Sequence, residues 1–303
     1  MAVTLPEAVL ARYERFSLYN SPYPAHDGGC AIDCYPGTLV DGRTTVAPSP
    51  VAGTVRETRT VRAPPKPYAP DHDHLILLEP ADSGPFAGLT VRVLHVEPSV
   101  AAGDRVDRGD SLGRLVRAGF FAPWVDNHLH VGFRGPDQNP YRASGSLPIE
   151  LDVPVRPLEW DGTGRVVSTG DTYAVLDAPT HPDPGAEFVG VRADGGGVLD
   201  GGIPHYDGGG LLEPRGSLDV DRDRNPVVSL NGDRLGVADG RTIAWDDVTV
   251  TADGEAITGL SLFCARDGDF GAKLICPDRE FRSGERVRVR VRSSDDRRDG
   301  RVG

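Results

Sequence analysis

The chain has 303 residues, enough for two domains that each bury a core, and its formal net charge is −12 at pH 7. So acidic a surface repels nucleic acid phosphates and anionic membranes, and we expect neither as a partner. No apolar run approaches the roughly 18 residues of a membrane-spanning helix.

Arginine supplies nearly all of the positive charge, because only Lys66 and Lys273 are lysines among 33 basic residues. This abundance of aspartate and arginine resembles the acidic proteins of salt-loving organisms. Most aspartates are therefore interpreted as solvated surface groups.

Residues 1–20 are interpreted as a lead segment. A short amphipathic helix is predicted over residues 5–16, because Thr4 is a suitable N-cap, Pro6 fits the first turn and apolar residues recur with helical spacing. Charged residues stand where a signal peptide has its apolar stretch, and we expect a cytoplasmic protein.

Helix signals nearly vanish after this segment. Residues 21–140 contain short alternating runs, such as VRVLHVEP and HLILLEP, separated by Gly, Pro and Asp clusters typical of turns. The polar stretch 134–146 is the expected boundary to a second domain. The sequence thus predicts an all-β first domain.

Residues 147–293 are also predicted to be β-rich. Asn231-Gly232 and Asp253-Gly254 are hairpin signals between alternating runs, and the spacing favours a sandwich or barrel of about eight strands. The tail 294–303 is almost entirely polar and charged and is predicted to be disordered.

Candidate metal ligands come from three runs of the first domain. His128 and His130 alternate within NHLHVGF, so both side chains project from one face of a strand. His26 and Asp33 belong to AHDGGCAID and offer one nitrogen and one oxygen ligand. His95, in the run VRVLHVEP, is a candidate acid-base group.

The remaining histidines are less informative. His72 and His74 also share one strand face, in PDHDHLILL, but they lie in a charged stretch and are interpreted as surface groups. His205 is expected in a loop.

Four cysteines do not make a disulfide framework in a chain of this length. They are interpreted as small buried thiols, with a four-cysteine zinc site as the alternative. Their positions are Cys30, Cys34, Cys264 and Cys276.

The order of AHDGGCAID, VAPSPVAGTV, VLHVEPSVAAGDRVDRGDSLGRL and NHLHVGF resembles the lysostaphin-type zinc metallopeptidases. This resemblance implies a duplicated hybrid motif, with a β-sandwich or barrel core, in residues 21–140. It implies one Zn²⁺ per chain. In the family pattern the zinc ligands fall on His26, Asp33 and His130, while the catalytic histidines fall on His95 and His128.

The sequence departs from the family at two places. Six residues separate His26 from Asp33 where three are common, and Cys30 stands at the common spacing. We favour Asp33, because alternation in Ala31-Ile32-Asp33 turns it away from the core toward a facing strand that presents His130. The bulky run AGFFAPWVDN replaces a Gly-rich loop, so a different substrate cleft is expected.

Three functions compete. The first is a zinc-dependent peptidase or amidase acting on a peptide-containing substrate. The second is a non-catalytic descendant, a binding module whose partner domain recognises a protein or glycan. The third, a lipoyl-type carrier, requires a lysine at a hairpin tip, and Lys66 lies instead in a Pro-rich loop and Lys273 in the second domain.

Overall fold

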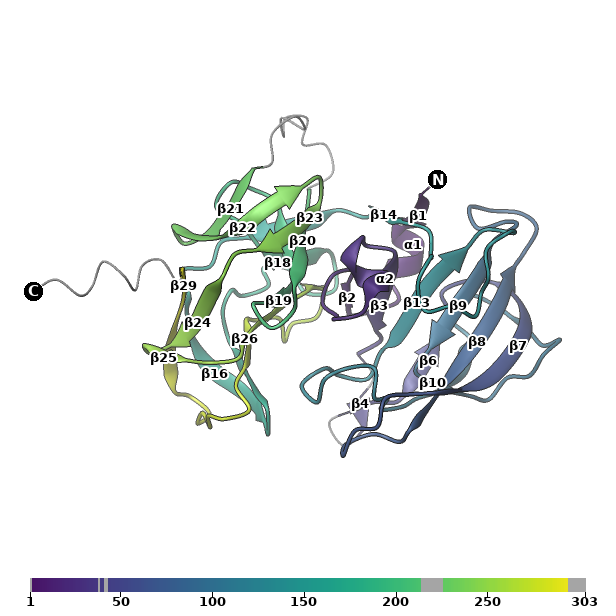
Figure 1. Cartoon of the computed structure of the whole chain (residues 1–303), viewed down its shortest axis with the longest axis horizontal. Helices are drawn as coiled ribbons and strands as arrows, with labels where there is room; N and C mark the ends of the chain where they lie inside the picture. The colour runs from purple at the N-terminus through teal and green to yellow at the C-terminus, as the bar shows by residue number, and fades with distance from the viewer. Residues whose placement is uncertain (1, 38, 41–42, 214–225, 294–303) are drawn as a thin grey trace, which may run out of the picture. The chain divides into compact units, whose positions relative to one another are not determined.

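The computed structural model describes residues 2–37, 39–40, 43–213 and 226–293. It divides into two compact units. Unit 1 comprises Met1–Leu18 and Tyr23–Val153, and unit 2 comprises Tyr19–Pro22 and Pro154–Gly303. The regular secondary structure of both units is almost entirely β-strand (Figure 1), which confirms the predicted all-β class. Within the described residues, no helix has the length and apolar character needed to span a membrane.

The described part of unit 1 consists of short strands with two single-turn helices near its N-terminus. Its elements are β1 (Val3–Pro6), α1 (Glu7–Leu10), β2 (Arg15–Ser17), α2 (Pro24–Asp27), β3 (Ala31–Tyr35), β4 (Leu39–Val40), β5 (Arg43–Thr44), β6 (Val46–Pro48), β7 (Gly53–Arg62), β8 (His72–Pro80), β9 (Thr90–Leu94), β10 (Val96–Pro98), β11 (Arg105–Val106), β12 (Ser111–Leu115), β13 (Leu129–Arg134) and β14 (Ile149–Asp152).

The main sheet of unit 1 has the order β11-β7-β8-β9-β13-β3-β2. Neighbouring strands in it are antiparallel, and β7, β8, β9 and β13 lie side by side in Figure 1. A small sheet, β10-β12-β6, accompanies it. Strand β13 is central, and Leu129, Val131 and Phe133 on it are almost fully buried. The strand β13 is therefore paired on both sides, with β3 and with β9.

The predicted helix over residues 5–16 is wrong. Only the four residues of α1 are helical, because residues 3–6 form β1, which pairs in parallel with β14, and residues 15–17 form β2, which pairs with β3. The apolar positions chosen for the helix are nevertheless buried, including Leu5 and Tyr13. Burial of the same side chains by strand pairing has overridden local helix propensity.

The units divide at Val153 and Pro154, later than the expected boundary at 134–146. The cause is again β14, whose pairing with β1 keeps residues 149–152 in unit 1. Residues 1–18 are likewise an integral part of unit 1 and not a separate lead segment. The tail 294–303 lies outside the described residues.

In the described residues of unit 2, the regular secondary structure consists only of strands. These are β15 (Val155–Leu158), β16 (Thr163–Gly170), β17 (Tyr173–Leu176), β18 (Phe188–Val191), β19 (Val198–Ile203), β20 (Gly208–Leu212), β21 (Val227–Leu230), β22 (Asp233–Asp239), β23 (Thr242–Trp245), β24 (Val248–Ala252), β25 (Glu255–Ala256), β26 (Gly259–Leu262), β27 (Cys264–Ala265), β28 (Lys273–Ile275) and β29 (Arg286–Ser293).

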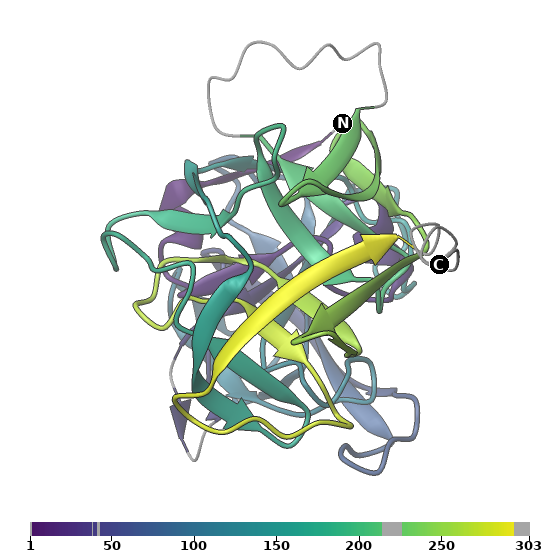
Figure 2. The same ribbon diagram turned by 90° about the vertical axis from the view of Figure 1, so that its left-hand side faces the viewer.

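Most of these strands form one continuous 12-stranded sheet, ordered β21-β22-β23-β20-β19-β26-β28-β17-β16-β29-β24-β25 within the described residues. The sheet curls until β22 contacts β29, and the side chains inside form one hydrophobic core. Figure 2 shows β29, in yellow, beside β24. The expectation of about eight strands was therefore too low.

Both predicted hairpin turns of unit 2 are confirmed. Asn231-Gly232 joins β21 to β22, and Asp253-Gly254 joins β24 to β25. All four turn residues have positive φ, between 52° and 89°. Two-residue turns of this kind require a left-handed backbone, which asparagine, aspartate and glycine adopt most easily.

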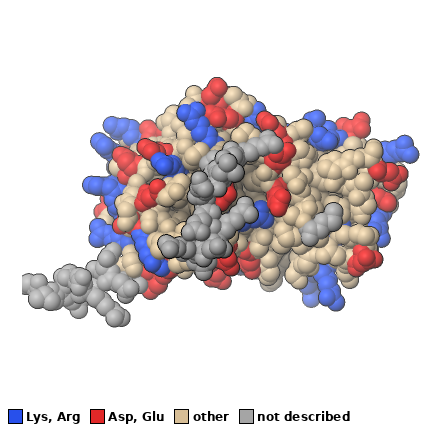
Figure 3. Space-filling view, turned by 90° about the horizontal axis from the view of Figure 1, so that it is seen from above, with Lys and Arg blue, Asp and Glu red and all other residues tan. Residues whose placement is uncertain are grey.

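Charged side chains of both signs are scattered over one face of the molecule (Figure 3). Acidic and basic groups lie side by side on the face shown in Figure 3. On this face the carboxylates are dispersed among basic groups.

Candidate metal centre

The register between β3 and β13 places Asp33 directly opposite His130. The two residues lie on the same face of the sheet, and His130 Nδ1 is 2.9 Å from Asp33 Oδ1. The predicted alternation is thus confirmed: Ile32 is fully buried in the core, and Asp33 points from the other face toward His130.

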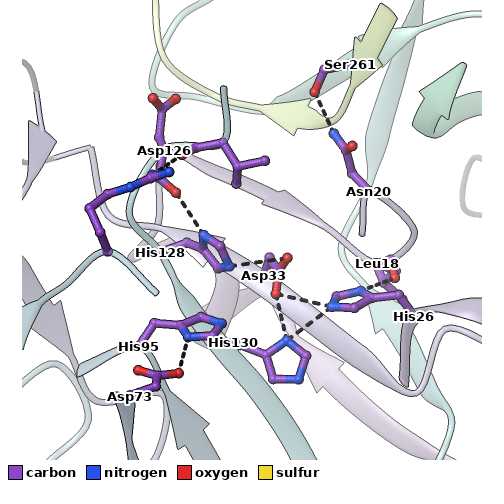
Figure 4. A network of polar contacts seen from close by, with 12 residues as sticks. Leu18, Asn20, His26, Asp33, Asp73, His95, Asp126, His128, His130 and Ser261 are labelled. Atoms are coloured by element: carbon purple, nitrogen blue, oxygen red, sulfur yellow. Dashed lines mark hydrogen bonds and ion pairs between the residues drawn. The ribbon is translucent and has the colours of Figure 1, made fainter. Parts of the chain in front are cut away.

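His26 reaches the same point from α2, a single turn that starts with Pro24 at its first position. Its Nδ1 lies 2.6 Å from the carbonyl oxygen of Leu18 and donates a hydrogen bond to it. That bond fixes the tautomer, so Nε2 carries the lone pair, and Nε2 lies 3.1 Å from His130 Nδ1 and 3.3 Å from Asp33 Oδ1 (Figure 4).

These three atoms form a triangle with edges of 2.9, 3.1 and 3.3 Å. A tetrahedral zinc site with ligand bonds of about 2.0 Å has ligand-to-ligand edges of about 3.3 Å. Two imidazoles and one carboxylate are also a donor set that zinc accepts. The group of His26, Asp33 and His130 therefore fits a zinc ion with little movement.

The protonation states suit a metal as well. Burial lowers the pKa of His130 to about 4, so its imidazole is neutral near pH 7. Burial alone would raise the pKa of Asp33, but the neighbouring histidines His128, His26 and His130 hold it well below its usual range. His130 thus presents a neutral nitrogen and Asp33 an ionised carboxylate, the forms that bind metal.

His128 lies beside this group but is oriented differently. Its Nδ1 donates to the carbonyl oxygen of Asp126 at 2.8 Å, and its Nε2 lies 3.4 Å from Asp33 Oδ2, the oxygen that does not face His130 (Figure 4). Burial lowers the pKa of His128 to about 4. Its Nε2 is therefore a neutral proton acceptor next to the three-residue group.

His95 also faces the site, from the junction of β9 and β10. Its ring centroid is 5.0 Å from that of His128 and 5.8 Å from that of His130. Its φ is 70°, which is uncommon for a residue other than glycine. Such strain persists only where the surroundings impose it, and here it turns the imidazole toward the other histidines.

The sequence analysis missed Asp73, which holds His95 in place. Asp73 is completely buried, and its Oδ2 accepts a 2.6 Å hydrogen bond from His95 Nδ1 (Figure 4). Its Oδ1 accepts from the backbone N–H of His74 at 2.7 Å. Burial would raise the pKa of Asp73, but His95 and these hydrogen bonds hold it below the usual value. The alternation in HDHLILLEP could have revealed this burial, because it places Asp73 on the same face of the strand as the apolar residue Leu75.

The apolar run 118–127 covers the two non-ligand histidines. The Phe121 ring lies 4.7 Å from the His128 ring and 5.0 Å from the His95 ring, measured between centroids. The Arg117 guanidinium fixes the run by donating hydrogen bonds to the carbonyl oxygens of Ala122 and Val125. It also makes a cation–π contact with the Phe121 ring. His130 keeps the largest exposure of the ligand group, with 13% of its side chain accessible.

Cys30 lies outside the group that could hold a metal among the described residues. Its Sγ contacts the carbonyl oxygen of Gly28 at 3.7 Å. The four cysteines are free thiols, and Cys34, Cys264 and Cys276 are buried.

Other predicted groups lie apart from the candidate metal centre. His72 is exposed and His74 half-buried on β8, and their rings meet edge to face with centroids 5.8 Å apart. His205 lies in a turn after β19. Lys66 is exposed between β7 and β8, whereas Lys273 is buried with its ammonium group 4.4 Å above the Tyr173 ring.

Two family models match the chain. Residues 4–151 match the N-terminal domain of DUF8155, described as a domain of unknown function, and residues 156–292 match the C-terminal domain of the same family. The two matches together span nearly the whole chain, which therefore belongs to the DUF8155 family.

No curated protein matches the chain significantly. One solved structure, entitled "Structure of the SpoIIQ-SpoIIIAH pore forming complex", aligns at 20% sequence identity with a TM-score of 0.26. The alignment covers 45% of this chain and 86% of the other. A similarity this low supports no functional inference.

Proposed function

We propose that unit 1 is a zinc-dependent hydrolase of a peptide or related amide bond, with one zinc ion held by His26, Asp33 and His130. The observation that carries the proposal is the convergence of three donor atoms, from three separate segments, within 4.8 Å of one another. A structural zinc site normally has four protein ligands, whereas three ligands leave one position for water or substrate.

The groups beside the ligand set suit proton transfer. Zinc, when bound, polarises a carbonyl group and lowers the pKa of water toward neutrality. His95 and His128 each donate their Nδ1 hydrogen to a fixed oxygen, of Asp73 and Asp126 respectively. Each therefore keeps Nε2 as a proton acceptor, able to take a proton from attacking water and return it to a leaving amine.

Asp73 has an orienting role in this proposal. A buried carboxylate that accepts from Nδ1 holds the imidazole of His95 in one tautomer and stabilises the imidazolium that forms during proton transfer. Phe121 excludes water from the same histidines, which strengthens these electrostatic interactions.

The run 118–127 sets the conditions for substrate entry. Because His95 and His128 are at most 4% exposed, a peptide reaches them only when Phe121 and its neighbours move aside. We therefore expect a narrow, extended substrate, and slow turnover limited by this movement.

A second candidate function is a metal-bearing module without catalytic activity. The burial of His95 and His128 favours it, since a site that stays closed binds zinc but admits no substrate. In that case the metal stabilises unit 1, and recognition belongs to other surfaces.

Two measurements on the full chain separate the candidates. The first is zinc content of the purified protein by mass spectrometry, for which both candidates require about one ion per chain. The second is cleavage of a library of quenched fluorescent peptides, before and after chelation. Zinc-dependent cleavage supports the hydrolase, and zinc without cleavage supports the non-catalytic module. Absence of zinc even after reconstitution would overturn both.

The variant Phe121→Ala tests the role of the covering run. Removing the ring should open the path to His95 and His128 and raise cleavage of bulky peptides relative to slim ones. An unchanged preference would show that Phe121 does not limit entry.

A further inference from the structure

Strand β29 of unit 2 carries a row of arginines on one face. Its sequence RVRVRVRS alternates, so Val287, Val289 and Val291 lie in the core while the four arginines between them face outward. Residues of one face follow each other at about 6.6 Å along a strand. We define the arginine row as Arg286, Arg288, Arg290 and Arg292 of β29 together with Arg165 of β16.

The strands on either side extend this pattern. Arg165 lies directly opposite Arg286, and Thr163 lies opposite Arg288. On the other side, Thr249 and Thr251 of β24 lie opposite Arg292 and Arg290. Guanidinium and hydroxyl groups thus occupy neighbouring positions on one sheet face, with no carboxylate at any of these paired positions.

This arrangement carries an electrostatic cost. Like charges directly opposite each other destabilise a sheet pair, and Arg165 and Arg286 form such a pair. Asp161 interacts electrostatically with Arg286 and Arg290. Within the described part of the chain, the guanidinium groups of Arg288 and Arg292 have no ion-pair partner, in contrast to Arg279, which pairs with Asp253 at 3.4 Å. The chain has a net charge of −12, so it has more than enough carboxylates to pair with these arginines.

The surface is hollowed at the row. Arg288, Arg290 and Arg292 line a hollow of about 730 Å³ together with Asn231 and Gly254. Two carboxylates also line it. Asp253 is already engaged by the Arg288 backbone N–H at 2.9 Å and by Arg279. The second carboxylate is Asp233, so three guanidinium groups outnumber the acidic ones.

We propose that the arginine row is a binding face for a linear anionic polysaccharide that bears carboxylate or sulfate groups. Guanidinium groups bind such anions through paired hydrogen bonds. The regular spacing of the row suits a chain with repeated charges.

A nucleic acid fits this face less well. Sequence-tolerant binding of single strands depends on aromatic side chains that stack on the bases. The positions paired with β29 on this face are threonine and arginine, and none is aromatic. The arginine row therefore favours a glycan, and its binding is independent of the candidate metal centre.

The test uses the full chain and isothermal titration with polygalacturonate and heparin, with dextran as a neutral control. Both anionic chains should bind and dextran should not. The triple variant R288Q/R290Q/R292Q should bind about 100-fold more weakly or worse, as expected from the loss of several charge-assisted hydrogen bonds.

A matched variant, R56Q/R105Q/R142Q, changes the net charge equally at exposed positions of unit 1. It should bind like the unmodified protein. Equal weakening in both variants would overturn the proposal, because net charge alone would then explain binding. Failure to bind either anionic chain would also overturn it, as would tighter binding of an oligo-dT strand than of both polysaccharides. Circular dichroism of each variant confirms that its fold is retained.

Discussion

Two strands of one sheet carry the same His-x-His pattern and use it in opposite ways. In His128-Leu129-His130 the outer residues face the candidate metal centre and the leucine is in the core. In His72-Asp73-His74 of β8 the middle residue faces inward and hydrogen-bonds His95.

The difference arises from what lies opposite each strand. β13 is paired with β3, which presents Asp33 to His130. β8 is paired with β7, which presents Arg62 to His72 and Thr60 to His74. Neither Arg62 nor Thr60 is a carboxylate that could complete a metal site with His72 and His74. Among the described residues, these two histidines therefore form no metal-binding group. The motif therefore identifies candidates, and the facing strand selects among them.

The largest expected effect is on zinc content, and it distinguishes the His128/His130 pair from the His72/His74 pair. His130→Ala should reduce zinc from about one ion per chain to none, because it removes one of three ligands, while His74→Ala should leave zinc content unchanged. Zinc measured by mass spectrometry after dialysis decides this. Full zinc occupancy in His130→Ala would exclude the proposed ligand set.

The next effect distinguishes His128, which immediately precedes β13, from His130 on β13. His128→Ala should retain zinc and lower peptide hydrolysis by about 10²- to 10⁴-fold, as expected for loss of an acid-base group. His72→Ala is the control from β8 and should alter neither. Equal zinc loss in His128→Ala and His130→Ala would mean that the two roles are wrongly assigned.

The choice between Asp33 and Cys30 can be measured by titration against a competing chelator. Asp33→Ala should weaken zinc binding by more than the roughly 10- to 100-fold that loss of an outer-shell partner costs. Cys30→Ser should leave the affinity nearly unchanged, because Cys30 lies outside the ligand group. A weaker Cys30→Ser protein would identify the thiolate as the ligand.

Asp73, the inward-facing residue of His72-Asp73-His74, provides a test with a smaller expected effect. Asp73→Asn should keep zinc but lower hydrolysis by about 10- to 100-fold, because His95 loses the acceptor that fixes its tautomer. The ¹⁵N chemical shifts of the His95 ring should change in parallel. Asp71→Asn, at an exposed neighbour, is the matched control. Unchanged ring shifts in Asp73→Asn would remove its orienting role.

The smallest effect concerns pH. The pKa values of His128 and His130 are lowered to about 4 in the folded protein, whereas an unfolded histidine titrates near 6.5. Between these values only the unfolded chain binds the protons, so the free energy of unfolding of the zinc-free protein should fall as pH drops from about 6.5 to about 4. Urea titrations across this range should show it, and His128→Asn/His130→Asn should be less sensitive.

Much of the site was accessible from the sequence because its signals are local. Alternation in NHLHVGF and in Ala31-Ile32-Asp33 predicts which side chains share a face, and the structure has His26, Asp33 and His130 together. Asp73 was missed because a carboxylate between two histidines resembles the dispersed surface aspartates of this acidic chain. Its burial depends on β9 and His95, which lie about 20 residues further along.

The sequence by itself determined the all-β class and the two hairpin turns of unit 2, since alternation and turn chemistry act over a few residues. The choice of candidate ligands rested on the resemblance to the lysostaphin-type family. Tertiary structure alone decided that residues 3–6 form a strand with β14, that β3 faces β13, and that Phe121 covers His95 and His128. These outcomes join segments that are distant in the chain. Their energies come from shared burial and strand pairing, which no local pattern encodes.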